Sequence, residues 1–131
     1  MLKRDSLMAQ MQLLGHVLDK VKRQILEDKE DLALSEVRDT LTHYYDMTEA
    51  YLSRTPIDIF LLEVKQRQYE AEELRMLAAF IDELAGLMED DNQRKALWHK
   101  VVALYDLLEQ EYKVFSFDHV SRRQLLMKAL E

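Results

Sequence analysis

Two stretches of the sequence repeat one pattern, EDKEDLALSEVRDTL at residues 27–41 and EDDNQRKALWHKVVAL at residues 89–104. Each begins with an acidic run and continues into Ala33 or Ala96, with a small or apolar residue, Thr40 or Ala103, seven positions later. This spacing keeps both residues on one helix face, where a second helix can cross closely. The pattern therefore predicts an all-α fold of stacked antiparallel hairpins, an architecture that usually holds other proteins.

Length and composition favour a single helical domain over residues 1–131. Hydrophobic residues make up 48% of the chain and charged residues 33%, which is the balance of a folded, helix-rich protein. Two glycines and one proline are the only strong breakers, so most of the chain can be helical. The absence of cysteine excludes disulfides, thiol catalysis and thiolate metal sites, and it fits a cytoplasmic protein.

Charge and hydropathy argue against two classes of partner. The net charge of −7 repels phosphate backbones, and the basic clusters are short (Lys22 with Arg23, and Arg122 with Arg123 and Lys128), so we expect no nucleic acid. No segment approaches the roughly 20 apolar residues of a membrane span, and the N-terminal stretch lacks the apolar run of a signal peptide. We therefore expect no membrane partner.

The first predicted hairpin begins with a helix from Asp5 to Glu27. Its apolar residues alternate steps of four and three, at Leu7, Met11, Leu14, Leu18, Val21 and Ile25. Such a stripe either packs inside the chain, which we favour in so short a sequence, or pairs with another copy as a homodimer. A second helix then doubles back, with Leu34, Val37, Leu41 and Tyr44 on one face.

Four more helices complete a prediction of about six. The Thr55-Pro56-Ile57-Asp58 segment predicts a helix start, since threonine caps and proline suits the first turn. The predicted core faces of this helix and the next, on either side of a weak break at residues 65–69, are Ile57, Phe60, Leu61 and Val64, then Leu74, Leu77, Ala78, Ile81, Leu84 and Met88. A fifth helix carries Leu97, Val101, Leu104 and Leu108, and the last is capped by Ser116 with Asp118 and ends at Leu130.

These hairpins resemble tetratricopeptide repeats. Leu14-Gly15 resembles the Leu-Gly pair of the repeat, and Ala33 and Ala96 resemble its small crossing residue. LMAQMQLLGHVL and ALYDLLEQEYKVFSFDHVSRRQLLMKAL resemble a bacterial family of small all-helical, tetratricopeptide-like proteins of unknown function. The resemblance implies a right-handed stack of antiparallel hairpins. Lys100 stands where the repeat usually has an aromatic residue, no repeat-ending proline follows either hairpin and the first helix is too long, so we expect the packing without regular repeats.

Motifs of catalysis or cofactor binding are not found in the sequence. It contains no glycine-rich phosphate loop, no Gly-x-Ser-x-Gly elbow and no His-Glu-x-x-His pair. Asp39 and His43 share a helix face and could form half of a metal site, although a salt-linked surface pair is the simpler interpretation. We therefore expect neither an enzyme nor a bound cofactor or metal.

Two hypotheses of function remain. The first is an interaction module that binds a protein or peptide between its hairpins; the second is a structural homo-oligomer that associates through its first helix. In tetratricopeptide-like hairpins the first helix lines the concave side, and its polar stripe here contains Gln12, His16 and Arg23. Arg75 could add a second guanidinium for a carboxylate, so these four residues are the predicted partner-binding set. The six tyrosines also suit partner recognition, although most are expected at the edge of the core.

Overall fold

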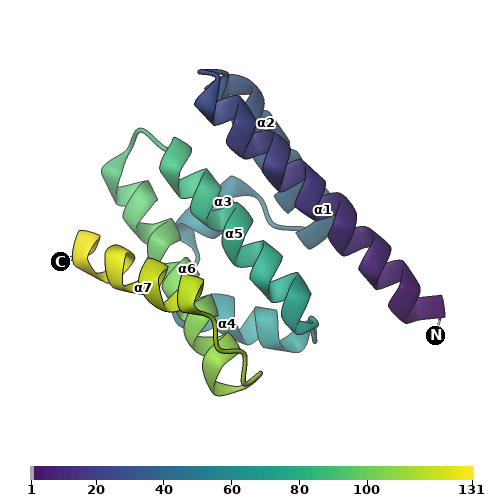
Figure 1. The fold of residues 1–131 in the computed structure, drawn as a ribbon. Helices are drawn as coiled ribbons and strands as arrows, with labels where there is room; N and C mark the ends of the chain where they lie inside the picture. The colour runs from purple at the N-terminus through teal and green to yellow at the C-terminus, as the bar shows by residue number, and fades with distance from the viewer. Residues whose placement is uncertain (1) are drawn as a thin grey trace.

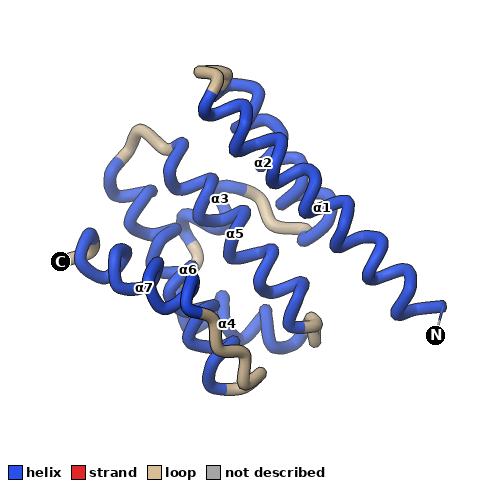
Figure 2. The backbone as a smooth tube through the Cα atoms, in the orientation of Figure 1, coloured by secondary structure: helices blue, strands red, loops and turns tan. Residues whose placement is uncertain are grey.

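The computed structural model describes residues 2–131, and in this range the chain contains helices and loops but no strand (Figures 1 and 2). The all-α prediction is therefore confirmed, with one helix more than expected in the described part. The helices are α1 (Leu2–Leu26), α2 (Glu30–Tyr45), α3 (Glu49–Arg54), α4 (Ile57–Gln66), α5 (Ala71–Leu87), α6 (Asp91–Gln110) and α7 (Phe117–Ala129). No helix in residues 2–131 is both long and apolar enough to cross a membrane.

Helices α1 and α2 form the first hairpin and run side by side in opposite directions (Figure 1). The helices are joined by residues 27–29, where Asp28 adopts the left-handed backbone conformation with φ 60°. The predicted stripe of α1 faces inward, because Leu14 and Val21 are buried and Met11, Leu18 and Ile25 pack against the core, while Leu7 is partly buried. The stripe thus packs inside the chain, as we favoured from the sequence.

Helix α3 was not predicted. Thr48 caps its first turn by accepting a hydrogen bond from the Tyr51 backbone N–H at 3.1 Å, and Pro56 follows its end. The helix spans six residues, and only Leu52 among them is buried. Periodicity cannot identify a helix this short, because a single buried residue defines no repeating face.

The predicted break between α4 and α5 is real. Helix α4 ends at Gln66, Gln68 adopts a left-handed backbone with φ 55°, and α5 begins at Ala71. Glu70 and Glu73 form a capping box at this start, in which the Glu73 carboxylate accepts from the Glu70 backbone N–H at 3.0 Å. The acidic residues therefore fix the start of α5, in addition to keeping the surface polar.

Two details of α4 differ from the prediction. Pro56 occupies the N-cap position, one residue before the first helical residue. Ile57 was expected in the core but is exposed, whereas Phe60 and Val64 are buried. Helix α4 is anchored by the face that carries these two side chains, and Ile57 at its first turn lies beyond that contact.

Helix α5 is the centre of the molecule, since it packs against α6, α2 and α1 (Figure 1). Contact on several sides buries Ala78 and Ala85, which are seven residues apart. The expected close crossings are therefore only partly correct: Ala33 in α2 is fully buried, but Ala96 in α6 is only partly buried. The small residues buried in the second hairpin lie on α5, because α6 turns its bulky residues Leu97, Val101, Leu104 and Leu108 into the core.

Helices α6 and α7 begin at well-formed caps. The Asp90 carboxylate accepts from the Asn92 and Gln93 backbone N–H groups at 2.8 and 3.1 Å. The predicted cap Ser116 accepts from the His119 backbone N–H at 3.4 Å, and α7 ends at Ala129, one residue before the predicted end. Leu126 is the only buried residue that α7 contributes.

Candidate functional site

The polar stripe predicted on the first helix is on the surface. Gln12, His16 and Arg23 are all exposed, and they share one face of α1 that points away from the buried Leu14 and Val21. On one flank of this face, Lys20 pairs with Glu36 of α2 across 2.7 Å. The structure thus brings these three predicted residues together on an accessible face.

Arg75 is not brought together with this stripe. Its guanidinium pairs with Glu72 at 2.9 Å on the surface of α5, and its charge acts on His119 of α7. Lys22, the residue before Arg23, acts on Glu83 of α5, and Glu83 lies eight residues and about 12 Å along this helix from Arg75. The four residues therefore form two separate surfaces.

Five of the six tyrosines take part in hydrogen bonds at the junctions between helices. The Tyr45 hydroxyl donates to the Glu73 carbonyl at 2.6 Å, the Tyr44 hydroxyl donates to the Glu73 carboxylate at 3.1 Å, and the Tyr112 hydroxyl donates to the Tyr69 carbonyl at 2.9 Å. The Tyr51 hydroxyl donates to Glu63, and Arg67 donates to the Tyr45 carbonyl and, at 3.1 Å, to the Tyr69 hydroxyl. Burial, with Glu73 nearby, raises the pKa of Tyr44 to about 12. These residues stabilise the fold, as we expected for most of them.

The Asp39 and His43 pair has a local role in the structure. His43 Nδ1 lies 2.8 Å from the Asp39 carbonyl oxygen, one turn earlier in α2, so its ring is engaged with the backbone instead of the carboxylate. Among residues 2–131 no group of three or more histidine, aspartate or glutamate side chains is arranged to hold a metal ion.

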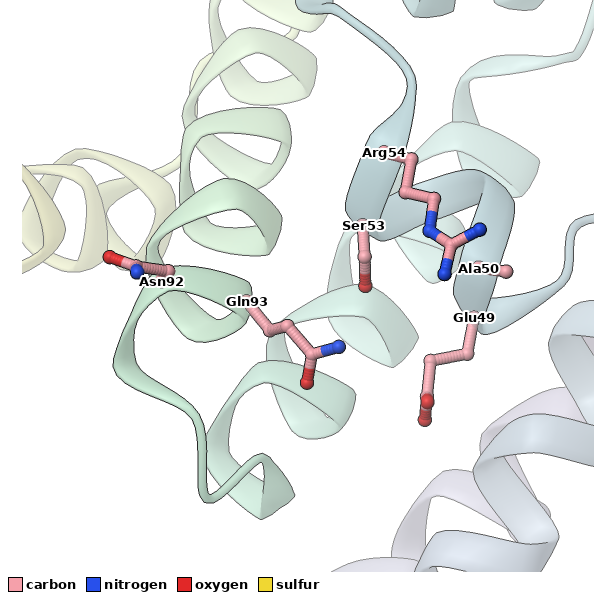
Figure 3. Close-up of a pocket in the computed structure, with 6 residues that line it drawn as sticks. All are labelled: Glu49, Ala50, Ser53, Arg54, Asn92 and Gln93. Atoms are coloured by element: carbon pink, nitrogen blue, oxygen red, sulfur yellow. The ribbon is translucent and has the colours of Figure 1, made fainter.

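A polar cavity of about 270 Å³ separates α3 from the start of α6 (Figure 3). Figure 3 shows the side chains of Ser53 and Gln93 directed into it from the two helices, with Glu49 at its edge. Glu49 is already held by Arg38 at 2.8 Å. The cavity is open to solvent, and five of its six lining residues are polar or charged, whereas small-molecule sites are mostly enclosed and lined by hydrophobic side chains. The cavity therefore lacks the features of a small-molecule site.

Helix α7 is attached to the rest of the fold by ion pairs as well as by the buried Leu126. Arg122 donates two hydrogen bonds to Asp82 of α5 at 2.8 and 2.7 Å, and Arg123 donates two to Asp106 of α6 at 2.7 and 3.2 Å. The Trp98 indole N–H also donates to Asp82, at 3.3 Å. Two-point pairs of this kind fix orientation as well as position. The basic cluster noted in the sequence is therefore largely neutralised by ion pairs inside the molecule.

The inner side of α7 is completed by an aromatic contact. The His119 ring stacks on Tyr105 of α6 with ring centres 4.4 Å apart and planes 17° apart. Burial, together with the charge of Arg75, lowers the pKa of His119. A neutral imidazole is thus favoured between α6 and α7, and polar side chains occupy most of the inner face of this helix.

Exposed apolar side chains gather on the outer side of α7, with the polar residues Ser121, Gln124 and Lys128 between them. Phe117 is 92% exposed and Leu125 62% exposed, and the other exposed apolar side chains in this part of the chain are Phe115, Val120 and Met127. Together these five residues form the α7 outer surface. Positions 117, 120 and 127 follow the three-and-four spacing of one helix face, with Gln124 between them. This surface could not be predicted from the sequence, because apolar spacing alone does not show which side of a helix faces the core.

The α7 outer surface is the strongest candidate for binding. Five of the twelve large apolar residues exposed in the described chain lie within residues 115–127. Gathered apolar surface of this kind marks contact sites for other proteins, whereas isolated exposed apolar residues are common and carry no such meaning. A smaller group on α4, Ile57, Ile59 and Leu62, is the second largest.

Comparison with known proteins gives no relative from which a role could be transferred: no family model, curated protein or solved structure matches this chain.

Proposed function

We propose that this protein is a non-catalytic interaction module of the cytoplasm that binds a protein or peptide partner. The observation that carries the proposal is the α7 outer surface. A helix held by the pairs Arg122–Asp82 and Arg123–Asp106 presents Phe117 and its apolar neighbours to solvent. Covering that surface with a partner removes apolar area from water, which is favourable by about 25 cal/mol per Å² before the costs of association.

The arrangement of the hairpins supports a tetratricopeptide-like stack as the scaffold for this surface. Helix α5 packs on both helices of the first hairpin, and α6 packs on α5, so neighbouring hairpins share a continuous core. Between the hairpins the chain inserts α3 and α4, which both contact α6. We propose that the stack is right-handed, as in the repeats it resembles, with α3 and α4 as an insertion.

The predicted set Gln12, His16, Arg23 and Arg75 remains a proposal for a second, polar contact. The α1 face is accessible, and a carboxylate of a peptide could pair with Arg23 there. Arg75 would act on a separate surface near α7, where Glu72 already shares its charge. Arg23→Ala should therefore weaken binding of an acidic peptide that uses α1, while Arg75→Ala should leave that binding unchanged.

Association through the first helix, the alternative function, has less surface available to it. Leu14 and Val21 of its stripe are buried against the rest of the chain, so this stripe cannot pair with another copy without opening the core. Exposed apolar residues on α1, such as Met8 and Leu13, are not arranged as a continuous stripe.

Capture of binding partners by two matched variants tests the proposal. Phe117→Ser removes an apolar side chain from the α7 outer surface, and Leu62→Ser removes one that is 57% exposed on α4. Neither should change the melting temperature by more than a few degrees, because both side chains lie outside the core. Partners bound through α7 should be lost with Phe117→Ser and kept with Leu62→Ser. Equal recovery by wild type and Phe117→Ser would refute the assignment of binding to this surface.

A further inference from the structure

The position of the α7 outer surface restricts what could cover it. Figure 1 shows α7 at the side of the molecule away from the α1–α2 hairpin, and its inner side contacts α6 and, through Asp82, α5. Helix α7 is therefore the outermost helix on this side of the described chain. Terminal layers of stacked helical proteins usually carry a polar outer face, which ends the stack and keeps it soluble. The exposed residues of α7 include large apolar side chains that such a polar face lacks, namely Phe117, Val120, Leu125 and Met127, beside the polar Asp118, Ser121, Gln124 and Lys128.

The charges that border the α7 outer surface suit one particular arrangement. Asp118 lies at the beginning of α7 and Lys128 near its end, and both are exposed. The two side chains are separated by ten residues, or about 15 Å along the helix axis. If two α7 helices pack in opposite directions, the end with Asp118 in each meets the end with Lys128 in the other. Two opposite-charge contacts then form in each pair, and the helix dipoles also oppose favourably.

The remaining charges of the helix do not disturb this pairing. Arg122 and Arg123 are occupied by Asp82 and Asp106 on the inner side, so the middle of the outer surface presents no charge. The exposed residues there are Val120, Ser121, Gln124 and Leu125. Polar side chains among apolar residues fix register when helices associate. The α7 outer surface is therefore complementary to itself, as a two-fold symmetric interface requires, because such an interface brings together the same surface of both copies.

We propose that the α7 outer surface binds a second copy of this chain, with the two α7 helices antiparallel and Asp118 of each copy beside Lys128 of the other. The proposal rests on the interaction function assigned to this surface and names the partner. One helix from each copy gives an interface at the small end of the range for specific contacts, so the dissociation constant should be on the order of 10–100 μM.

Charge-reversal variants test the partner and the direction together. Asp118→Lys places basic groups at both ends of the surface, and Lys128→Glu places acidic groups at both ends, so each variant should repel itself. Sedimentation equilibrium from 1 μM to 1 mM should show dimers for wild type and association about tenfold or more weaker for either variant. An equimolar mixture of the two variants should recover dimers of wild-type strength, because the two basic ends of one variant would then meet the two acidic ends of the other.

Recovery on mixing also shows that both variants are folded, since an unfolded helix could not restore the contact. Phe117→Ser should abolish the dimer, and Leu62→Ser on α4 should leave it intact. A wild type that stays monomeric up to 1 mM would overturn the second copy as partner. The proposed interaction function would survive that result if Phe117→Ser still loses a captured protein. A dimer whose strength is unchanged in both charge variants, with no change on mixing, would overturn the antiparallel arrangement.

Discussion

Replacing Lys100 by methionine is expected to stabilise the protein. Lys100 is 2% exposed on the side of α6 that meets α3 and α4, and its ammonium lies 5.7 Å from the centre of the Phe60 ring. No ion pair to Lys100 is present among the described side chains of residues 5–131, so the Phe60 ring and the remaining contact with water are what compensate for burying the charge. Burial accordingly lowers the pKa of this lysine.

The magnitude follows from two opposing effects. An ammonium held over an aromatic ring is stabilised by about 0.5–2 kcal/mol. Removing an ion from water costs several kcal/mol even after the surrounding protein relaxes. Methionine keeps a flexible apolar chain of similar length and can place its sulfur against the ring, which recovers about 0.3–1.5 kcal/mol. We therefore expect Lys100→Met to raise the free energy of unfolding by about 1–2 kcal/mol, or the melting temperature by about 3–8 °C.

Thermal melts followed by circular dichroism at pH 7 and pH 10 provide the measurement. The folded protein holds the proton of Lys100 less tightly than the unfolded chain, whose lysine pKa is 10.5. The unfolded state therefore binds more protons in this window, and wild-type stability gains as the pH rises through the lowered pKa towards 10.5. The difference between Lys100→Met and wild type should be largest at pH 7 and should narrow at pH 10.

Lys95→Met is the matched control, because Lys95 lies on the same helix and pairs with Asp91 at 3.3 Å on the surface. It should change the melting temperature by no more than about 2 °C at either pH, as expected for a surface ion pair. A melting temperature several degrees below wild type for Lys100→Met would refute the reasoning, since it would show that the charge contributes more to stability than its burial costs.

Three further predictions concern packing, backbone and pH. Ala33→Arg should abolish or loosen the fold, because the alanine that it replaces is fully buried. Ala96→Arg should lower the melting temperature by only a few degrees, because Ala96 is partly buried, and circular dichroism melts distinguish the two variants. Gly15→Ala should raise the free energy of unfolding by about 0.5–1 kcal/mol in denaturant titrations, since glycine weakens a helix interior and an added Cβ meets no atom within 4 Å. A lower free energy of unfolding would contradict this, because it would show that the added methyl group clashes with a neighbouring atom. The lowered pKa of His119 means that its neutral form is favoured in the folded state, so the free energy of unfolding should fall as the pH drops below about 6.5. The fall should be smaller in His119→Phe. An equal fall in wild type and His119→Phe would contradict this role of His119.

The long helices could be predicted because their core residues repeat at a helical period. In α5, Leu74, Leu77, Ala78, Ile81 and Leu84 were all predicted in the core and all are buried. The break before α5 was also visible, as a loss of that period over residues 65–69. A face repeated over several turns is strong evidence for a helix, because few other structures need that spacing.

Features that depend on distant parts of the chain could not be predicted. Helix α3 has one buried residue, so its position is set by contact with α6 and not by its own pattern. Lys100 occupies a position where the tetratricopeptide repeat usually has an aromatic residue, and a charged residue in a helix is normally assigned to the surface. Its burial follows from the placement of Phe60, forty residues earlier, which no local pattern shows.

The orientation of α7 shows the same limit most clearly, and it bears on function. Apolar periodicity alone would turn Phe117, Val120 and Met127 towards the core. The structure instead turns Arg122 and Arg123 inward, because each finds an aspartate of a different helix at two-point hydrogen-bonding distance. Those partners are 40 and 17 residues away in sequence, so the choice between the two faces is made only when the helices assemble. Because the two arginines take positions on the inner side, Phe117, Val120 and Met127 remain exposed to water, and gathered apolar area of this kind favours the proposal that a partner covers this surface.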